Sequence, residues 1–342
     1  MKAPSRSFPG LCVGLLLALL MATAQAADAP RVKLAMLAPK GSIFHRVALE
    51  LGEDYRKAAG GGAAFTVYPD GVQGGEADIV RRMRVGQLNA AMLSVIGLVE
   101  IDPSAAALQQ IPMLFRSVEE VDHVVRALRP EIERCFAEQG FVALLWAEIG
   151  WVRVFSQVPV GVPADLKGRR IFAWAGDGEQ VEIMKRLGYR PVVLETADMV
   201  PGLQTGLIDT VPVTPIWALA TQIDRLAPHM TELKWAPVVG ALVFTRTAWE
   251  AMSPSTREAL RAGAQRSRDE LRAYAERADA DAVAAMVQRG LKVRRLTPDD
   301  ETAWQSLAEQ IYPLIRGRTV PAPLFDETLR LVGEYRGSHG RP

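Results

Sequence analysis

Cysteine is scarce in this sequence, and its scarcity excludes an internal disulfide framework. The 342 residues include two cysteines, Cys12 and Cys135. Cys12 lies in an amino-terminal segment that we expect to be removed, and a mature chain with Cys135 alone cannot form an intramolecular disulfide. Stability therefore has to come from a hydrophobic core, which a chain of this length can build as about two lobes of roughly 150 residues each.

The sequence also lacks an apolar run long enough to span a membrane. The run Leu11–Met21 is too short, because a membrane-spanning helix needs about 20 apolar residues. It follows the positive residues Lys2 and Arg6, and it is followed by small residues that end at Ala26. That order predicts a secretory signal peptide over residues 1–26, cleaved after Ala26, and hence an exported protein.

A large excess of charge of one sign is absent as well. The sequence has 40 Lys and Arg residues against 39 Asp and Glu. The predicted signal peptide carries two of the basic residues and no acid, which leaves 38 basic against 39 acidic residues and a net charge of −1. Proteins that bind nucleic acids need a basic surface, so we expect no nucleic-acid partner.

Short motifs typical of catalytic or metal chemistry are missing. The sequence has no phosphate-binding loop ending in GK[ST], no HExxH, no CxxC and no GxSxG, and "GDGEQ" (176–180) lacks the spacing of a dinucleotide-binding loop. The four histidines are scattered. His45 follows the first predicted strand and is a candidate cleft residue, against the alternative of a surface or capping histidine. We therefore expect a binding protein rather than an enzyme, with no metal and no cofactor.

Two copies of a strand–helix pattern indicate an α/β protein with parallel sheets and two lobes. A proline-free, Ala-, Arg- and Glu-rich stretch over residues 255–288 predicts one helix of about 35 residues, roughly 50 Å long, which should lie across both lobes. Connecting strands near 145–150 and 236–246 suggest a hinge. The expected division is lobe I over 27–150 with about 239–280 returning, lobe II over 151–238 with about 281–335 packing on it, and a disordered tail over 336–342.

One predicted strand has an unusual face. In "GRRIFAWAG" (168–176), alternation places Arg170, Phe172 and Trp174 on one side, with Ile171 and Ala173 on the other. An arginine beside two large aromatic residues suits neither an ordinary core nor an ordinary solvated face. Ligands of α/β sheets bind at the carboxyl ends of strands and between domains, so we expect this face to line a cleft between the lobes.

Several segments resemble the signature motifs of one family. They are "VYPDGVQGGEADIVRRMRVGQLNAAM", "QQIPMLFRSVEEVDHV", "VPADLKGRRI" and "LGYRPVVLETADMVPGLQTGLID". Each resembles a motif of the DctP family, the solute-binding proteins of TRAP (tripartite ATP-independent periplasmic) transporters. The matches run in family order from about residue 32 to 265, with a compatible helical tail.

This resemblance implies a periplasmic-binding-protein (Venus flytrap) fold: two α/β lobes, a long C-terminal helix spanning both, and a ligand enclosed between them. It implies a periplasmic carrier that delivers its solute to TRAP membrane subunits, and we expect it to be a monomer. A sensory binding protein that presents the ligand to a receptor has the same fold and stays an alternative.

Family members usually hold a carboxylate with an arginine in a "KiRvP" motif, because an arginine fork pairs with a carboxylate in a directional manner. Aligned through "DLKG", that position is Phe172 here. A second family arginine, in "GfRhft", resembles Arg153 of "GWVRVFS", although one extra residue separates Arg153 from Gly150. Arg153 is the candidate charged ligand contact, against a structural arginine that pairs with Glu148 or another hinge carboxylate. Arg170 is a second candidate, against a surface position.

The family's polar position in "vDgqenp" is shifted by one residue in "IDTVPVTPIW", where Thr214 is the nearest polar candidate and Trp217 follows. Phe172, Trp174, Thr214 and Trp217 together predict a pocket more apolar than the family's usual one. Two ligands fit this prediction: an organic acid with an apolar or aromatic body, its carboxylate on Arg153, or a neutral hydrophobic molecule. We favour the organic acid here, since a buried Arg153 without a counter-ion costs several kcal/mol.

Overall fold

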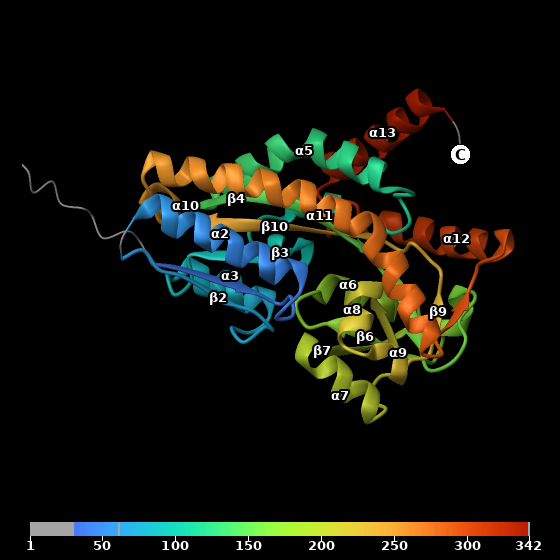
Figure 1. The fold of residues 1–342 in the computed structure, drawn as a ribbon. Helices are drawn as coiled ribbons and strands as arrows, with labels where there is room; N and C mark the ends of the chain where they lie inside the picture. Colours follow the sequence, from blue (N-terminus) through green and yellow to red (C-terminus); the bar gives the residue numbers. More distant parts are fainter. Residues whose placement is uncertain (1–30, 61, 341–342) are drawn as a thin grey trace, which may run out of the picture.

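The computed structural model describes residues 31–60 and 62–340, which form two lobes, each built on one sheet (Figure 1). The first sheet has the strand order β2-β1-β3-β10-β4. Its first three members run parallel, and β10 pairs antiparallel with both β3 and β4. The strands are β1 (Val32–Met36), β2 (Phe65–Tyr68), β3 (Ala90–Ser94), β4 (Phe141–Trp151) and β10 (Pro237–Thr245). The expected signal peptide, residues 1–26, lies outside the described residues.

The second sheet has the strand order β11-β9-β5-β8-β6-β7. Strand β6 pairs parallel with β7 and β8, whereas β5 pairs antiparallel with β8 and β9. Its strands are β5 (Arg153–Ser156), β6 (Arg170–Trp174), β7 (Arg190–Leu194), β8 (Thr210–Val213), β9 (His229–Thr231) and β11 (Lys292–Arg294).

Helices join and cover these strands. In the first lobe they are α2 (Ile43–Ala59), α3 (Glu76–Arg84), α4 (Val95–Leu98), the 3-10 helix η1 (Pro103–Leu108), α5 (Val118–Glu138) and α10 (Arg246–Glu250). In the second they are η2 (Pro163–Leu166), α6 (Gly178–Arg186), η3 (Thr196–Asp198), α7 (Met199–Gln204), α8 (Pro215–Ala220) and α9 (Ile223–Leu226). The alternation of strand and helix confirms the predicted α/β class.

Two chain segments run side by side where the lobes meet. The chain leaves β4 and enters β5 at Val152, and it returns through Trp235 and Ala236 into β10. Val152 donates its N–H to Ala236 at 2.9 Å, and Trp235 donates its N–H back to Val152 at 3.1 Å. These two paired segments form the hinge between the lobes, close to the expected connections.

The predicted long helix is present as α11 (Pro254–Gln288), with 35 residues. It lies along α2 and β4 of the first lobe and continues onto α8 of the second (Figure 1). At the hinge, Asp279 of α11 accepts the N–H of Trp151 at 3.1 Å. Gly150 lies beside it with φ +133°, and a Cβ there would come within 2.8 Å of the Asp279 carboxylate. The helix is therefore fixed to the crossing strand at a position that requires glycine.

The C-terminal helices differ from the prediction. Helix α12 (Pro298–Ile315) packs on η2 of the second lobe, as expected, but α13 (Ala322–His339) packs on α5 and η1 of the first lobe. The tail expected to be disordered from residue 336 is helical through His339. An ion pair explains this, because Arg336 contacts the buried Glu120 of α5 at 2.7 Å and anchors the last turns.

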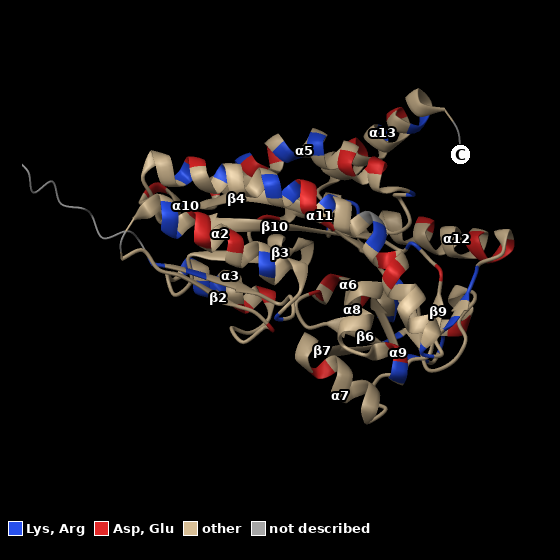
Figure 2. Cartoon of the chain, viewed as in Figure 1, with Lys and Arg blue, Asp and Glu red and all other residues tan. Residues whose placement is uncertain are grey.

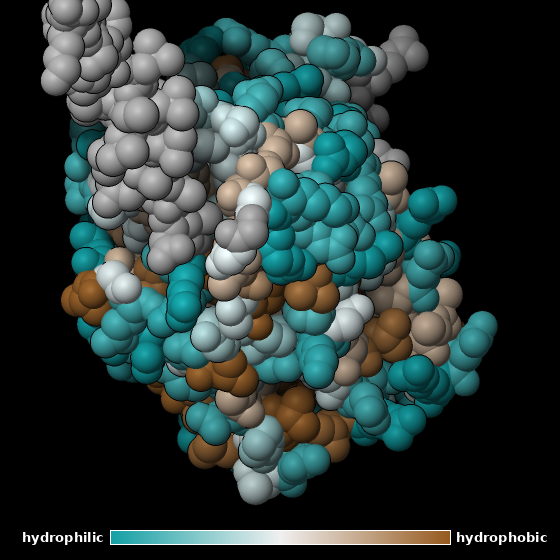
Figure 3. Space-filling view, turned by 60° about the vertical axis from the view of Figure 1, so that its left-hand side comes forward, coloured by the Kyte–Doolittle hydropathy of each residue, from teal (hydrophilic) through white to brown (hydrophobic). Residues whose placement is uncertain are grey.

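Charges of both signs are interspersed over the outer helices (Figure 2). On the face shown in Figure 3, hydrophobic surface is broken into patches by hydrophilic side chains. Among the described residues, no helix has both the length and the hydropathy needed to cross a bilayer.

Candidate functional site

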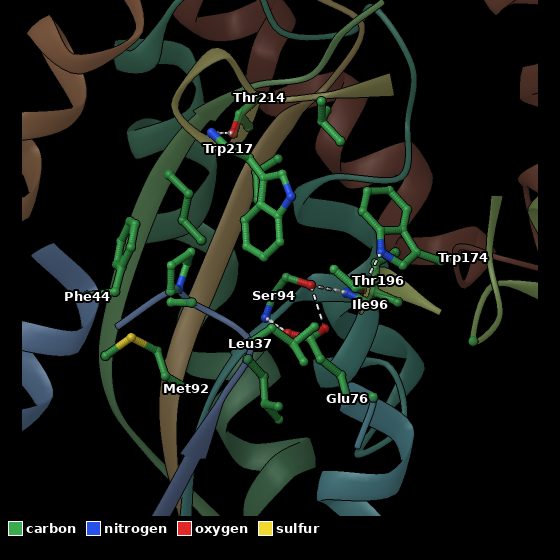
Figure 4. Close-up of a pocket in the computed structure, with 18 of the residues that line it drawn as sticks. Leu37, Phe44, Glu76, Met92, Ser94, Ile96, Trp174, Thr196, Thr214 and Trp217 are labelled. Carbon is green, nitrogen blue, oxygen red and sulfur yellow. Dashed lines mark hydrogen bonds between the residues drawn. The ribbon is translucent and has the colours of Figure 1, made fainter. Parts of the chain in front are cut away.

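A cavity of about 280 Å³ lies between the two lobes. The first lobe lines it mainly with residues at the carboxyl ends of β1 and β3 and at the first turns of α2 and α3, and the second lobe with residues at the ends of β6 and β8 and the start of α8. This is where α/β sheets bind ligands. Lining residues that Figure 4 labels are Leu37, Phe44, Glu76, Met92, Ser94, Ile96, Trp174, Thr196, Thr214 and Trp217.

The hydroxyl groups at this cleft cap helices. Ser42 accepts the N–H of His45 at 3.3 Å, Ser94 accepts the N–H of Ile96 at 3.2 Å, and Thr214 accepts the N–H of Trp217 at 3.3 Å. Each of these residues is the N-cap of the helix that follows a strand of the cleft. Because these oxygens already bind backbone, the remaining surface of the cleft is largely apolar.

Two tryptophans from the second lobe face this apolar surface. Trp217 stands in the first turn of α8, and its indole projects into the middle of the pocket (Figure 4). Trp174 ends β6 and forms one side of the pocket, where its Nε1 donates to Thr196 at 3.2 Å. Phe44 and Met92 lie on the opposite side. The arrangement can enclose a flat or bulky apolar group between rings.

A buried carboxyl group lies at the cleft surface of the first lobe. Glu76 begins α3 and accepts two hydrogen bonds from Ser94, from its N–H at 2.7 Å and from its hydroxyl at 2.6 Å. Burial raises the pKa of Glu76 from 4.5 to about 7, although the hydrogen bonds from Ser94 lower it in part. Burial therefore favours the protonated form of Glu76 much more than water does.

A second carboxylate reaches across from the other lobe. Glu195, which follows β7, places its Oε2 2.8 Å from the position of a Cβ on Gly75. Gly75 is the N-cap of α3 and has no side chain to cap that helix, so a carboxylate beside it is favoured by the helix dipole. The lobes thus approach each other closely at this edge of the cleft.

The cleft has acids but no opposing cation. Its ionisable lining residues include Glu76, Asp78, Glu100 and Glu195, and no lysine, arginine or histidine lines it within residues 31–60 and 62–340. Asp78 is paired with Arg81 on the outer side of α3. An anionic group that entered would therefore meet carboxylates instead of a counter-ion.

The structure brings three of the predicted site residues to the cleft: Trp174, Thr214 and Trp217. Phe172 is instead a core residue with 1% of its surface exposed, and it packs edge-on against Trp174 with ring centroids 5.1 Å apart. It supports the wall of the cleft rather than lining it.

Arg153 lies outside the cleft lining. Strand alternation turns it to the side of β5 opposite Val152, and it is Val152 that lines the cleft. Arg153 has one more residue between it and Gly150 than the arginine of the family motif has. Because neighbouring strand residues point to opposite faces, this extra residue turns Arg153 away from the cleft. On its own side Arg153 acts on a hinge carboxylate. Burial raises the pKa of Asp279, and the Trp151 N–H and the charge of Arg153 both lower it.

The two remaining candidates are also outside the lining. Arg170 pairs with Asp209 at 3.1 Å, and its side chain is 44% exposed. His45 accepts the N–H of Gly41 at 3.2 Å in the first turn of α2. Both occupy the surface or capping positions that were the alternatives for them.

Sequence reasoning missed Leu37, Phe44, Met92, Glu76 and Glu195. The first three are single apolar residues at the ends of strands or the start of a helix, and nothing in the local pattern separates them from core residues. Glu76 stands inside the quoted "GGE" motif, directly after the glycines that begin α3, so its place at a strand–helix junction was a usable signal. No group of three or more potential metal ligands occurs in the part of the chain described here.

Comparison with known proteins gives consistent matches. The chain is 24% identical over 239 residues to the uncharacterized protein YiiZ of Salmonella typhimurium, which covers 61% of this chain and 72% of the relative. It is 23% identical over 225 residues to the 2,3-diketo-L-gulonate-binding periplasmic protein YiaO of Escherichia coli, which covers 65% of this chain and 67% of the relative.

Solved structures of TRAP periplasmic solute-binding proteins share the fold. One from Chromohalobacter salexigens with bound D-glucuronate has a TM-score of 0.78 at 19% identity, covering 89% of this chain and 99% of that chain. One from Shewanella oneidensis with bound succinate has a TM-score of 0.81 at 15% identity, covering 88% and 99%. The family model described as bacterial extracellular solute-binding protein, family 7 (DctP), matches residues 34–316. The chain therefore belongs to the DctP family of TRAP solute-binding proteins.

Proposed function

We propose that this protein captures a small organic solute with an apolar body in the interlobe cleft and passes it to TRAP membrane subunits. Membership of the DctP family supports the carrier role. The bound D-glucuronate and succinate of the similar structures support a small organic solute. We further propose that the chain works in the periplasm after cleavage behind Ala26, which amino-terminal sequencing of the exported protein tests.

The observation that carries the proposed ligand class is the cleft lining. Trp174 and Trp217 face Phe44 and Met92 across it, and the ionisable lining groups in the described chain are acids. Burying a carboxylate without a counter-ion costs several kcal/mol. With Arg153 outside the cleft lining, the organic acid that the sequence favoured loses its candidate anchor. We therefore favour a ligand whose buried part is uncharged.

Binding is coupled to hinge closure in this proposal. A solute that contacts Trp217 of one lobe and Leu37 of the other stabilises the closed arrangement by its greater affinity for that arrangement. In this proposal the paired segments at Val152 and Ala236 are the hinge about which the lobes close. The membrane subunits would then recognise the closed surface.

Matched ligand pairs test the charge preference directly. Each pair keeps one ring and exchanges a carboxylate for a neutral group, as in benzoate against benzamide and phenylacetate against 2-phenylethanol. We expect the neutral member to raise the melting temperature and quench tryptophan fluorescence more strongly. Tighter binding of the acid in both pairs contradicts the proposal. Mass spectrometry of the solute retained during native purification identifies the natural ligand without a prior guess.

A further inference from the structure

A second cavity, of about 170 Å³, adjoins the cleft. Ile96, Gln109, Val152 and Trp174 line both cavities, so these side chains form a shared wall between them. Phe172 also borders the second cavity from the core side. We call the second cavity the rear chamber.

The rear chamber is built from two helices of the second lobe and the hinge. Helix α6 and its C-cap contribute Ile183, Met184 and Leu187, and α12 contributes Trp304, Leu307, Ile311 and Ile315. Trp235 of the hinge segment packs edge-on against Trp304 with ring centroids 6.0 Å apart. Each of the three α6 side chains packs against the core yet keeps part of its surface exposed. Apolar atoms that remain accessible in a cavity between the lobes are available for contact with an apolar part of a ligand.

Several polar groups of this chamber are already hydrogen-bonded, whereas the buried Oγ1 of Thr319 has no partner within the described residues. Asp177 accepts the N–H of Gln180 at 3.1 Å and caps α6, and Gln109 accepts the N–H of Val239 at 3.0 Å. The Trp304 indole N–H is donated to Gly161 at 2.8 Å. No lysine, arginine or histidine of the described chain lines the chamber. The lining of the rear chamber therefore favours an apolar hydrocarbon group of a ligand over a charged one.

The volumes of the two cavities also suggest that they form one ligand site. Pockets for small molecules usually measure about 300–1,000 Å³, and the cleft alone, at about 280 Å³, lies just below that range. With the rear chamber included, the space falls within it. The rear chamber, of about 170 Å³, is lined by both lobes and by the connecting segment, so it extends the space between the lobes.

From this continuity we propose that the rear chamber is a second subsite of the ligand site, which takes an aliphatic chain or second ring of the solute held between Trp174 and Trp217. The inference rests on the proposed function. Trp174 then lies between the cleft and the rear chamber, so a long ligand has to pass it. A change of the Trp174 rotamer would break its one side-chain hydrogen bond, which it donates to Thr196.

A homologous series of neutral probes tests this subsite: phenol, 4-ethylphenol, 4-butylphenol and 4-hexylphenol, with dissociation constants measured by isothermal titration calorimetry. Filling an apolar subsite improves affinity by about fourfold per methylene, so we expect a steep series in the wild-type protein. Gln180→Trp, which adds bulk at the chamber rim on α6, should flatten the series beyond the ethyl member. Leu187→Trp serves as a second blocking variant if the first does not fold.

Glu182→Trp is the matched control, because it lies on the same helix, is exposed and lines neither cavity. It should keep the wild-type slope. A flat series in the wild type, or equal slopes in Gln180→Trp and Glu182→Trp, overturns the rear chamber while phenol binding leaves the cleft proposal standing. If no member binds, the apolar cleft proposal fails and the rear chamber fails with it.

Discussion

Replacing Glu76 by glutamine should change how the stability of this protein depends on pH. Glutamine keeps the size of the side chain and can keep both contacts with Ser94, since its carbonyl accepts the Ser94 N–H and its amide donates to the Ser94 hydroxyl. The substitution removes the ionisation, and it also weakens the backbone hydrogen bond that Gly97 donates to Glu76, a loss that does not depend on pH. The comparison therefore isolates the cost of a negative charge at the floor of the cleft.

The size of the effect follows from the pKa. Burial raises the pKa of Glu76 from 4.5 to about 7, which corresponds to about 3 kcal/mol. A carboxyl group with a raised pKa in the folded state stabilises the protein fully below pH 4.5. Between pH 4.5 and about 7 the folded protein binds more protons than the unfolded chain, so that contribution is lost as the pH rises.

The assay is urea unfolding at several values from pH 4.5 to 8.5, with the free energy of unfolding of the wild type compared with that of Glu76→Gln. We expect the wild type to lose about 3 kcal/mol relative to the variant across this range. Glu148, Asp177 and Asp279, whose pKa values burial also raises, titrate in both proteins and cancel. The exposed Glu53→Gln is the control and should run parallel to the wild type. Parallel curves for Glu76→Gln would refute the reasoning.

Four further substitutions test the site and hinge. Trp217→Ala should weaken binding of a neutral aromatic solute by about 30-fold or more with a fold intact by circular dichroism, as loss of a central aromatic anchor does. Gly150→Ala should cost about 2 kcal/mol or more in urea unfolding, because a Cβ would meet Asp279 at a backbone angle that disfavours side chains. Arg153→Ala should leave ligand affinity unchanged by calorimetry and lower the melting temperature. Phe172→Arg should reduce the yield of folded protein sharply, because it buries a cation in the core; a soluble variant that binds small dicarboxylates would contradict this placement.

The fold was largely readable from the sequence because its signals are periodic and local. The long helix α11 (Pro254–Gln288) was predicted from the proline-free stretch 255–288 and from the capping residues at its start. The alternation of strand and helix indicated the sheets. The placement of α13 (Ala322–His339) was not readable, since it depends on Arg336 meeting Glu120 of a helix more than 200 residues earlier, and no local pattern encodes such a contact.

The candidate site was predicted less well, because a strand residue changes face with a shift of one position. Arg153 was assigned by the type of its side chain, and the single extra residue after Gly150 turned it to the α11 side and brought Val152 to the cleft. Strand alternation correctly placed Phe172 on the same face of β6 as Trp174. That face packs against the core of the second lobe near Met199 and Leu203, and it reaches the cleft only at Trp174, where the strand ends. The position of a residue along its strand therefore predicts whether it lines the cleft better than the chemistry of its side chain does.

Neither arginine of the family resemblance has a cationic counterpart in the cleft lining here. Phe172 stands at the first position by the alignment through "DLKG", and Arg153 at the second lies outside the lining, where its neighbour Val152 is found instead. Replacing one cation alone would leave the other as a buried charge, which costs several kcal/mol whenever no anion is bound. With neither cation in the lining, an apolar cleft is stable in the absence of ligand, and Glu76 can have a raised pKa there, since a nearby arginine would lower it. The lining, which is acidic and free of cations within the described residues, and the paired tryptophans therefore belong to one chemistry. In our proposal this chemistry selects the solute through burial of its apolar surface, and the cleft together with the rear chamber sets the solute's length.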